Sequence, residues 1–324
     1  MKASVFIVSY NTVDLLRQCL ASLFANTTGI DYEVFVVDNI SRDGSADMVR
    51  REFPTVKLIA NSVNVGFAAA NNQAYKDSTG EYLFLLNPDA EARPNAVNNA
   101  VAFMEAHPEA GMCGGRLLNP DGGLEPSARR FPGVISNFFI LSGLSDRYPN
   151  SPVFGRADYK YFDHQSVLAV DWVPGTFTAI RRSMIEQIGF FDERFYLYYE
   201  ETDLCLRANR AGWKIYFIPD AEIMHVGGAC SKTRADHDFD TSGSQLLSFR
   251  LRSEYLYFRK NHGLLSVLAN AVIEMGWHLL RIVVNVGGGP RRAAKRQYSR
   301  NIVRNTWRAL CDTGLGRTSP PCPW

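Results

Sequence analysis

The sequence predicts an α/β fold, with a mainly parallel central sheet flanked by helices and a helical region at the C-terminal end. Short apolar runs alternate with segments of helical periodicity through the first quarter of the chain. Each run ends at a polar residue, and the runs are near-continuously apolar, as strands covered on both faces are. Residues 243–310 show a helical pattern without such runs, so a different kind of structure follows the sheet.

The first elements follow one another in the order expected for parallel βαβ units. The opening apolar run is short and β-branched, and the segment after it places Val13, Leu16 and Leu20 on one helical face. The same alternation is then repeated. The expected strands span residues 5–10, 32–37, 56–59 and 81–86, and the expected helices span 12–25, 46–53 and 68–75.

The middle of the chain has a weaker pattern. Residues 111–118 form an apolar run that ends in turn residues at 119–123, and residues 126–165 have little periodicity, which indicates a long excursion or lid. Further expected elements are a strand at 167–173, a helix at 204–211 closed by Gly212, and a strand at 213–218. We therefore expect a first domain over residues 1–240 and a helical region over residues 241–324.

Composition excludes several classes of protein. The chain has 324 residues, of which 46% are hydrophobic and 21% charged, so it is globular and long enough to bury a large core. Its net charge of +2 gives no general argument for a nucleic-acid partner. The six cysteines show no CxxC spacing, which favours a reducing compartment. Because the N-terminus runs directly into a strand without a signal peptide, we expect a cytoplasmic location.

The chemistry-bearing residues are acids and one histidine at strand ends, since no GxGxxG, GxxxxGK[ST] or GxSxG motif occurs. Asp38 suits a hydrogen bond from a base or ribose, whereas Asp89 and His225 are candidate metal ligands. The acids Glu200, Glu201 and Asp203 lie at a helix start, where one could act as a general base. Each feature has a structural alternative: a strand-ending turn, a structural histidine, or acids favoured by the helix dipole.

These residues belong to a longer set of short motifs in a fixed order. The set consists of Val8-Ser9-Tyr10-Asn11, Val37-Asp38-Asn39, Asn64-Val65-Gly66-Phe67, Asn71, Leu86-Asn87-Pro88-Asp89, Trp172-Val173-Pro174-Gly175, Phe191-Asp192-Glu193, the acids at 200–203, Leu206-Arg207, Gly212-Trp213 and His225-Val226-Gly227-Gly228. Over about residues 4–230 the chain resembles an inverting nucleotide-sugar glycosyltransferase of family 2, which has the GT-A fold. It is most similar to the rhamnosyltransferase-like branch, in which an Asn such as Asn87 replaces the first acid of the DxD motif.

The resemblance implies a role for each position. Asp89 stands where the DxD motif ends in a metal-binding carboxylate, and His225 matches a family histidine of the metal site, so Mn²⁺ or Mg²⁺ is the expected cofactor. Trp172 and Gly175 would face the acceptor. The nucleotide-sugar donor would contact Tyr10, Asn11 and Asp38 through its base and ribose, and Asn64, Gly66, Asn71 and Asn87 in the rest of its pocket.

The general base is where the chain departs from the family pattern. The family uses the Asp of a Glu-Asp pair, whereas Glu201 occupies that position here and follows Glu200. We order the candidate bases as Glu201, then Glu200, then Asp203. The departure leaves open a non-catalytic, sugar-nucleotide-binding scaffold with a decayed base.

The reaction implied by the resemblance is transfer of L-rhamnose from dTDP-L-rhamnose to a glycan or lipid-linked acceptor. Its place would be the synthesis of a bacterial cell-surface polysaccharide such as O-antigen. UDP-hexose and UDP-galactofuranose are alternative donors. A nucleotidyltransferase shares this kind of sheet, but it needs a glycine-rich, basic first loop, which residues 9–12 do not supply.

Residues 264–286 form a long apolar helix candidate whose length approaches that of a membrane span. One polar stripe indicates an amphipathic helix, because four polar side chains are spaced four, four and three residues apart, namely Asn270, Glu274, His278 and Arg281. A basic segment follows from Arg291. These features predict peripheral contact with the cytoplasmic face of the inner membrane. The alternative is packing on the protein's own domain or on a second subunit of a homodimer.

Overall fold

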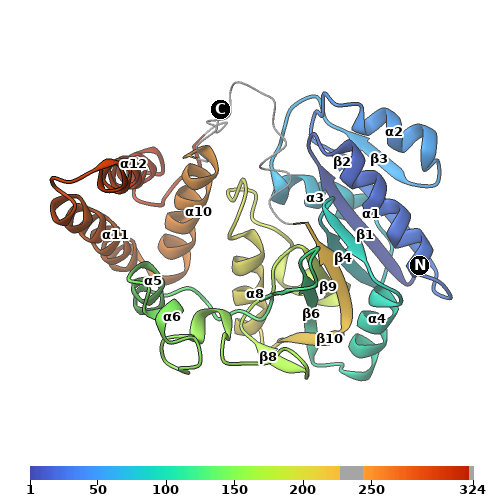
Figure 1. The fold of residues 1–324 in the computed structure, drawn as a ribbon. Coiled ribbons are helices and arrows are strands. Elements are labelled where there is room, and N and C mark those ends of the chain that lie inside the picture. The colour runs from blue at the N-terminus through green and yellow to red at the C-terminus, as the bar shows by residue number, and fades with distance from the viewer. Residues whose placement is uncertain (227–243, 321–324) are drawn as a thin grey trace. The chain divides into compact units, whose positions relative to one another are not determined.

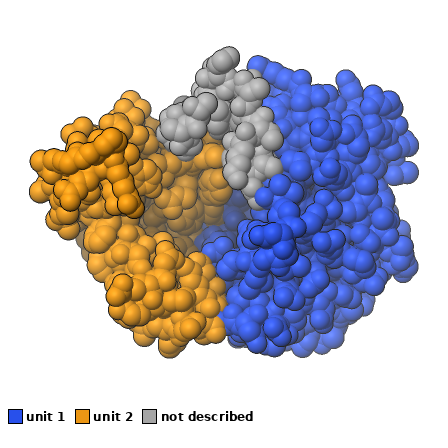
Figure 2. Space-filling model, viewed as in Figure 1, with its two compact units in different colours: residues 1–131, 162–193, 200–235 blue, residues 132–161, 194–199, 236–324 orange. Residues whose placement is uncertain are grey.

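The computed structural model describes residues 1–226 and 244–320, which belong to two compact units (Figure 1, Figure 2). Unit 1 comprises residues 1–131, 162–193 and 200–235, and unit 2 comprises residues 132–161, 194–199 and 236–324. Unit 2 therefore gathers a segment from the middle of the chain with the C-terminal helices. The expected boundary at residue 240 lies outside the described residues, as do Gly227 and Gly228.

The N-terminal half of unit 1 is the parallel part of the sheet. It contains β1 (Ala3–Ser9), β2 (Tyr32–Asp38), β3 (Lys57–Ala60) and β4 (Tyr82–Leu86), connected by α1 (Val13–Asn26), α2 (Ser45–Glu52) and α3 (Phe67–Asp77). The strands lie in the order β3-β2-β1-β4, and all three neighbouring pairs are parallel. Parallel neighbours need a crossover, and the amphipathic segments between the runs supply it as helices. The alternation expected from the sequence is confirmed.

The second half of the sheet in unit 1 is mixed. Its strands are β5 (Ala90–Ala92), β6 (Ala110–Leu118), β7 (Leu124–Glu125), β8 (Leu168–Val170), β9 (Phe177–Arg181) and β10 (Lys214–His225). β9 lies between β4 and β6 and is antiparallel to both, whereas β10 is parallel to β6. β5 and β8 pair antiparallel with β10, and β7 with β6. The end of β10 consequently lies beside β5, with His225 opposite Ala90.

Several elements of unit 1 differ from the expected ones. The sequence pattern did not predict α4 (Ala96–Ala106) or α7 (Arg182–Ile188), and it predicted a shorter helix than α8 (Glu200–Arg210). α8 begins four residues before the expected residue 204, because its first turn is acidic and the apolar periodicity starts only at Leu204. β10 continues past residue 218 through an irregularity in its pairing with β6 between Ile218 and Glu222. Local periodicity could not show this extension, since it depends on the partner strand.

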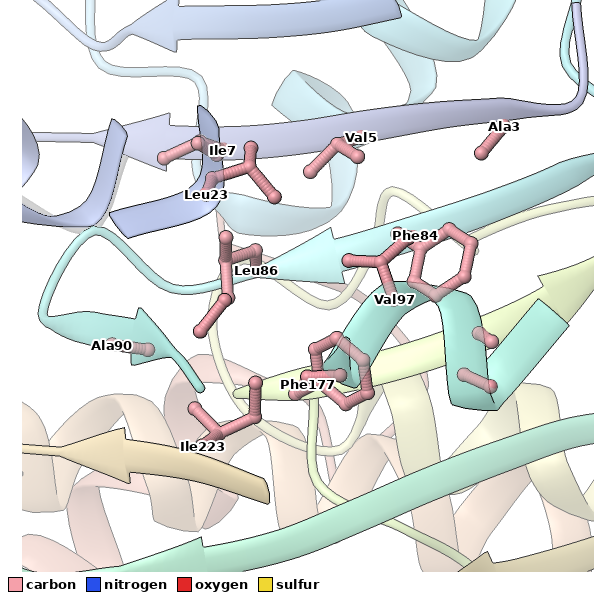
Figure 3. Close-up of a cluster of buried hydrophobic side chains, with 14 of the residues drawn as sticks. Ala3, Val5, Ile7, Leu23, Phe84, Leu86, Ala90, Val97, Phe177 and Ile223 are labelled. Atoms are coloured by element: carbon pink, nitrogen blue, oxygen red, sulfur yellow. The ribbon is translucent and has the colours of Figure 1, made fainter. Parts of the chain in front are cut away.

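One hydrophobic cluster of unit 1 lies on the face of the sheet that packs against helices α1, α2 and α4 (Figure 3). Ala3, Val5 and Ile7 of β1 all join it and are at most 1% exposed, as the two-residue period of a strand requires. Phe84 and Leu86 continue the same face on β4. Burial of such side chains contributes about 25 cal/mol for each Å² of apolar surface removed from water.

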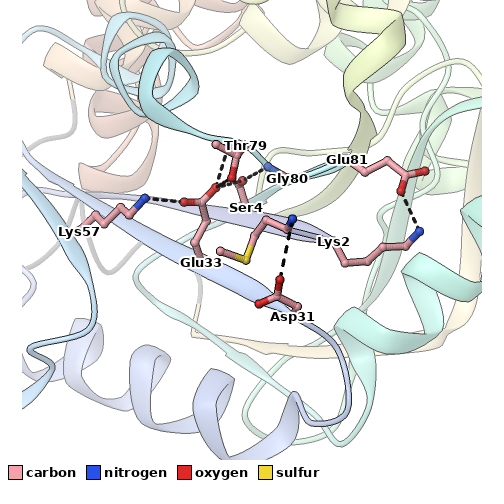
Figure 4. A network of polar contacts seen from close by, with 9 residues as sticks. Lys2, Ser4, Asp31, Glu33, Lys57, Thr79, Gly80 and Glu81 are labelled. Atoms are coloured by element: carbon pink, nitrogen blue, oxygen red, sulfur yellow. Dashed lines mark hydrogen bonds and ion pairs between the residues drawn. The ribbon is translucent and has the colours of Figure 1, made fainter.

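A polar network joins the N-terminal ends of β1, β2 and β3 to the residues before β4 (Figure 4). The Glu33 carboxylate accepts hydrogen bonds from the Lys57 ammonium and the Ser4 hydroxyl, each at 2.7 Å. The Thr79 backbone N–H donates another at 2.7 Å. Burial raises the pKa of Glu33, but these hydrogen bonds outweigh it and lower the pKa to about 2. Gly80 is required beside them, because a Cβ there would lie 2.5 Å from the backbone of Ser4.

Unit 2 is helical in its described part. Its helices are α5 (Val134–Leu141), α6 (Leu144–Arg147), the short 3₁₀ helix Arg156–Asp158, α10 (Ser244–His262), α11 (Leu264–Val284) and α12 (Pro290–Asp312). Gly263, with a φ of +84°, separates α10 from α11, and Pro290 begins α12. α11 confirms the helix expected at 264–286. The segment 126–165 contains α5 and α6, which its sequence did not reveal because α5 is apolar nearly throughout.

Candidate functional site

The ends of β1 and β2 place three donor-site candidates around one turn. Tyr10 and Asn11 follow β1, and Asn11 Oδ1 accepts a hydrogen bond from the Arg42 N–H at 2.7 Å. Asp38 Oδ2 accepts one from the Ser41 N–H at 2.9 Å, whereas its Oδ1 is covered and accepts none from the described residues. Burial raises the pKa of Asp38, although hydrogen bonds from Ser41 oppose the rise. An N–H or O–H group of a ligand would satisfy the second oxygen.

The turn before α3 holds three further candidates. Gly66 has a φ of +85°, a conformation that favours glycine, and its N–H donates to Asn64 Oδ1 at 3.0 Å. Asn39, directly after β2, donates to the Gly66 carbonyl at 3.3 Å, so this turn lies beside the end of β2. Asn71 donates to the Phe67 carbonyl at 2.9 Å, while its Oδ1 is buried and accepts no hydrogen bond from the described residues.

Asn87, Pro88 and Asp89 form a tight turn between β4 and β5. The Ala90 N–H donates to the Asn87 carbonyl at 3.1 Å and closes the turn. The Asn87 N–H donates to the Thr176 carbonyl at 3.0 Å, which ties the turn to the start of β9. Asp89 is only 4% exposed, although an ordinary turn would leave a carboxylate in water.

Asp89 and His225 face each other where β5 and β10 pair. Asp89 Oδ1 and His225 Nε2 are 3.4 Å apart, and both side chains are buried. The Val226 N–H donates to the Asp89 carbonyl at 3.0 Å and fixes this register. On the other side of the ring, Glu125 Oε2 lies 2.8 Å from His225 Nδ1. Burial lowers the pKa of His225, but the two carboxylates outweigh it and raise the pKa to about 9.

This arrangement fits a divalent metal ion. A carboxylate oxygen and an imidazole nitrogen are both ligands of Mn²⁺, and two ligands at right angles on one such ion stand roughly 3 Å apart. Glu125 has the place of the carboxylate that commonly accepts the second ring N–H of a metal-bound histidine. Among residues 1–226 and 244–320, no group of three or more His, Cys, Asp or Glu residues could hold a metal. The described residues therefore supply two candidate metal ligands, Asp89 and His225, and not a group of three.

Glu200, which is buried, and Glu201, which is half-buried, are two neighbouring carboxyl groups at the start of α8. Glu200 is 3% exposed, and the Oε2 atom of each residue is covered and has no hydrogen-bond partner among the described residues. Burial and then repulsion from Glu201 raise the pKa of Glu200 well above its usual range. Burial also raises the pKa of Glu201, but hydrogen bonds from Glu200 and the Gly175 N–H favour its ionised form. Burial therefore disfavours the ionised form of both carboxyl groups, and more strongly at Glu200.

Asp203, the third candidate base, belongs to a different set of contacts. It is fully buried, and its Oδ2 lies 2.9 Å from Arg207 Nε one turn later in α8. Arg207 also donates to the carbonyls of Ile188 and Gly189 at 2.7 and 2.9 Å. Arg207 thereby connects α8 to the end of α7, with Asp203 as its ion-pair partner.

The two acceptor-site candidates lie in the segment before β9. Trp172 Nε1 donates to the Arg130 carbonyl at 2.9 Å, and the Arg129 guanidinium lies 5.8 Å from the centre of its ring. Gly175 lies against the first turn of α3, since a Cβ there would be 3.5 Å from the Phe67 ring. Its N–H also binds Glu201, so the structure brings Gly175 and the first candidate base together.

The sequence pattern missed Glu125. It lies in a strand of two residues, β7, which is too short to show a period. The turn at 119–123 was recognised, and the hairpin that it closes pairs Glu125 with Leu117 of β6. If the hairpin is continued two residues past this turn, Glu125 lies on one side of β6. Because β10, which ends at His225, also pairs with β6, this continuation was the signal that could have placed Glu125 near His225.

Comparison with known protein sequences identifies the family. Residues 4–189 match glycosyl transferase family 2. The chain is 27% identical over 271 residues to N-acetylglucosaminyl-diphospho-decaprenol L-rhamnosyltransferase of Mycobacterium tuberculosis (strain CDC 1551 / Oshkosh), over 80% of this chain and 84% of that protein. It is 25% identical over 268 residues to rhamnosyltransferase WbbL of Escherichia coli (strain K12), over 79% of this chain and 92% of that protein.

Comparison with solved structures concerns the fold. The chain is similar to GalNAc-T7 in its crystal structure with UDP, GalNAc and Mn²⁺, with a TM-score of 0.51 and 15% sequence identity. The similarity covers 81% of this chain and 56% of that chain. The family and fold class expected from the sequence are thus confirmed. The chain belongs to glycosyl transferase family 2, has the GT-A fold, and counts proteins named rhamnosyltransferases among its relatives.

Proposed function

We propose that this chain is an inverting, metal-dependent rhamnosyltransferase that moves L-rhamnose from dTDP-L-rhamnose to a glycan or lipid-linked acceptor in bacterial cell-surface polysaccharide synthesis. The names of two relatives that match about four fifths of the chain support the sugar and the lipid-linked acceptor. The observation that carries the proposal is the Glu200–Glu201 pair at the start of α8, because inverting transfer needs a carboxylate that accepts the acceptor proton, and the Gly175 N–H binds Glu201 beside the proposed acceptor segment.

Glu201 is the proposed general base. The acceptor hydroxyl loses its proton as its oxygen attacks the anomeric carbon from the face opposite the leaving group, and Glu201 accepts that proton. Burial raises the pKa of this carboxyl group, which makes it a better proton acceptor than an exposed one. Glu200 would donate a hydrogen bond to Glu201 and so position the base. The Gly175 N–H holds the same carboxylate beside the proposed acceptor segment.

The donor nucleotide is proposed to bind at the ends of β1 and β2. Asp38 Oδ1 would accept a hydrogen bond from the base or the ribose, because it is the oxygen that the described protein leaves unsatisfied. Tyr10 and Asn11 would complete this part of the site. The turn around Gly66 and the buried Asn71 would line the remainder of the donor pocket, together with Asn87.

Asp89 and His225 are proposed to hold Mn²⁺ or Mg²⁺. GalNAc-T7, which shares the fold, was solved with Mn²⁺ and UDP. A bound divalent cation neutralises charge that develops on a leaving nucleoside diphosphate. Glu125 would orient His225 by accepting its Nδ1–H, which leaves Nε2 beside Asp89 for the ion.

Calorimetry with a panel of nucleotide sugars tests the proposal. The protein would be titrated with dTDP-L-rhamnose, UDP-glucose and UDP-galactofuranose, with and without Mn²⁺. We expect dTDP-L-rhamnose to bind most tightly, and its binding to lose Mn²⁺ dependence in Asp89→Ala. Glu125→Gln should weaken the Mn²⁺-dependent binding about 10- to 100-fold, the range for removal of a carboxylate behind a metal-bound histidine.

The outcomes separate the alternatives. A preference for UDP-glucose or UDP-galactofuranose would replace the proposed donor. Tight donor binding without transfer to any acceptor would favour the non-catalytic scaffold. A product whose anomeric configuration matches that of the donor, measured by NMR, would contradict the inverting mechanism.

A further inference from the structure

Helix α11 exposes one continuous apolar face. By length and composition it is also the one helix among the described residues that could cross a membrane. Only 22% of its most apolar 18-residue stretch is buried. Leu265 is 81% exposed, Val272 69% and Val283 67%. The exposed residues recur every three or four positions, as on one face of a helix. They are Leu264, Leu265, Leu268, Val272, Leu279, Leu280, Val283 and Val284. A soluble monomer rarely exposes so large a contiguous apolar surface without using it.

The polar stripe of α11 faces the interior of unit 2. Asn270 is 5% exposed and accepts a hydrogen bond at 2.9 Å from Asn137 of α5. His278 is 2% exposed, and its Nδ1 lies 3.2 Å from Ser299 Oγ of α12. Burial and the nearby Arg281 charge lower the pKa of His278 to about 4, so the buried ring is neutral. The apolar face is therefore the one that points outward, with its polar residues already engaged inside the unit.

The helix that packs against α11, α12, is strongly basic. Between residues 275 and 311 the sequence contains no Asp or Glu, whereas it contains Arg281, Arg291, Arg292, Lys295, Arg296, Arg300, Arg304 and Arg308. Most of them belong to α12, which packs along α11 within unit 2. Tyr298 and Trp307 of α12 are 55% and 60% exposed. Exposed aromatic and basic side chains on a helix that neighbours an apolar one are typical of a membrane–water interface.

We propose that the exposed face of α11 docks in the surface of an anionic phospholipid bilayer, with the basic residues of α12 bound to its head groups. The helix lies along the interface and does not span the bilayer. A spanning α11 would bring α12 with it, because the two helices pack together, and the charges at Arg291, Arg292 and Lys295 would then enter hydrocarbon. Charge selects this partner, since anionic lipids complement a segment that carries only positive charges.

Vesicle flotation with the full chain tests the proposal. Vesicles of phosphatidylcholine alone would be compared with vesicles of equal parts phosphatidylcholine and phosphatidylglycerol. We expect the protein to float with the anionic vesicles only. The combined substitutions Leu265→Ser, Val272→Ser and Val283→Ser should weaken partitioning more than tenfold, because each removes apolar surface that would leave water. Val63, Val153 and Val167, which are also exposed, changed together to Ser form the matched control.

The basic residues have their own comparison. Arg291→Gln with Arg292→Gln should weaken partitioning about fivefold for each charge. Arg50→Gln with Arg51→Gln, two exposed arginines of α2, should leave it unchanged.

Three results would overturn the proposal. They are equal flotation of the apolar triple variant and the unaltered protein, equal flotation with both vesicle types, and a dimer in sedimentation equilibrium that the triple variant dissolves while neither protein floats. The last result would assign the face to a second copy of the chain. Turnover with a soluble acceptor should be the same in every variant, so failure here is distinguishable from failure of the proposed reaction.

Discussion

The two ends of β2 each carry one buried carboxylate. The two differ in how many hydrogen bonds they accept and in the direction in which their pKa is shifted. Glu33, near the start of the strand, accepts hydrogen bonds from three neighbours that include Lys57, and its pKa falls to about 2. Asp38, at the end of the strand, accepts from the Ser41 N–H through Oδ2, while Oδ1 accepts nothing from the described residues. Burial raises the pKa of Asp38.

The difference separates groups that stabilise the fold from groups kept for a ligand. A buried carboxylate with all its hydrogen bonds contributes to stability, whereas one left unsatisfied costs about 1–3 kcal/mol. Asp38 has its unsatisfied oxygen at the end of β2, the end at which parallel strands place their ligands, and Glu200 and Glu201 have theirs at the start of α8. Glu33 lies at the opposite end of the strands, where the network of Figure 4 closes.

The largest expected effect is on turnover, and it concerns Glu201, one of the groups kept for a ligand. Glu201→Gln should lower turnover roughly 10²- to 10⁴-fold, because the amide cannot accept the acceptor proton. Donor affinity, measured by calorimetry, should change little, since Glu201 is not assigned to the donor. Near-normal turnover would remove Glu201 from the mechanism.

Glu200 supplies the control, and the pH dependence of kcat/KM supplies a second test. Glu200→Gln should retain most activity, because an amide N–H can still donate to Glu201. In the unaltered enzyme, kcat/KM should fall with decreasing pH through a pKa above the usual glutamate range, since burial raises the pKa of Glu201 and protonation removes the base. An acid limb at the ordinary glutamate value would contradict the assigned burial effect.

The second prediction concerns the satisfied end of β2. Glu33→Gln should lower the free energy of unfolding by about 2 kcal/mol at neutral pH, because it removes the charge that Lys57 and the N–H and O–H donors stabilise. This stability is present above the usual pKa of glutamate and is lost as the pH falls towards about 2. The difference between the proteins, measured by urea unfolding, should therefore shrink at acid pH. Glu186→Gln, at an exposed position of α7, serves as the control.

The smallest expected effect is at Asp38. Asp38→Asn should leave the free energy of unfolding at neutral pH unchanged or raise it slightly, because the raised pKa means that the ionised form is disfavoured in the folded state. Donor affinity should fall about tenfold, the worth of one hydrogen bond to a charged group. If the variant lost stability but kept its donor affinity, Asp38 would stabilise the fold as Glu33 does, and the two ends of β2 would not differ in role.

Much of the site could be predicted because its residues directly follow strong local patterns. Asp38 and Asp89 each come after an apolar run, so the ends of the strands could be located without a structure. Asp203 could not be separated from Glu201 in that way, because the distinction depends on the contact with Arg207 and the carbonyls at the end of α7. Glu125 left almost no local signal, since it acts from a strand of two residues.

α11 shows the same limit in unit 2. The spacing of Asn270, Glu274, His278 and Arg281 predicted one polar stripe, and the structure confirms a helix there. Periodicity gives the stripe but not the side on which neighbours pack. Contacts from α5 and α12 bury Asn270 and His278 and leave the apolar residues outside.

The sequence by itself determined the alternating strands and helices from β1 to β4, the family motifs and the polar residues at the ends of those strands, because each depends on neighbours within a few positions. Only the tertiary structure decided which of those residues meet. His225 pairs with Asp89, in the turn before β5, and with Glu125, which lies 100 residues away in the chain. The physical reason is that strand pairing and register are set by packing across the whole sheet, which no local period encodes.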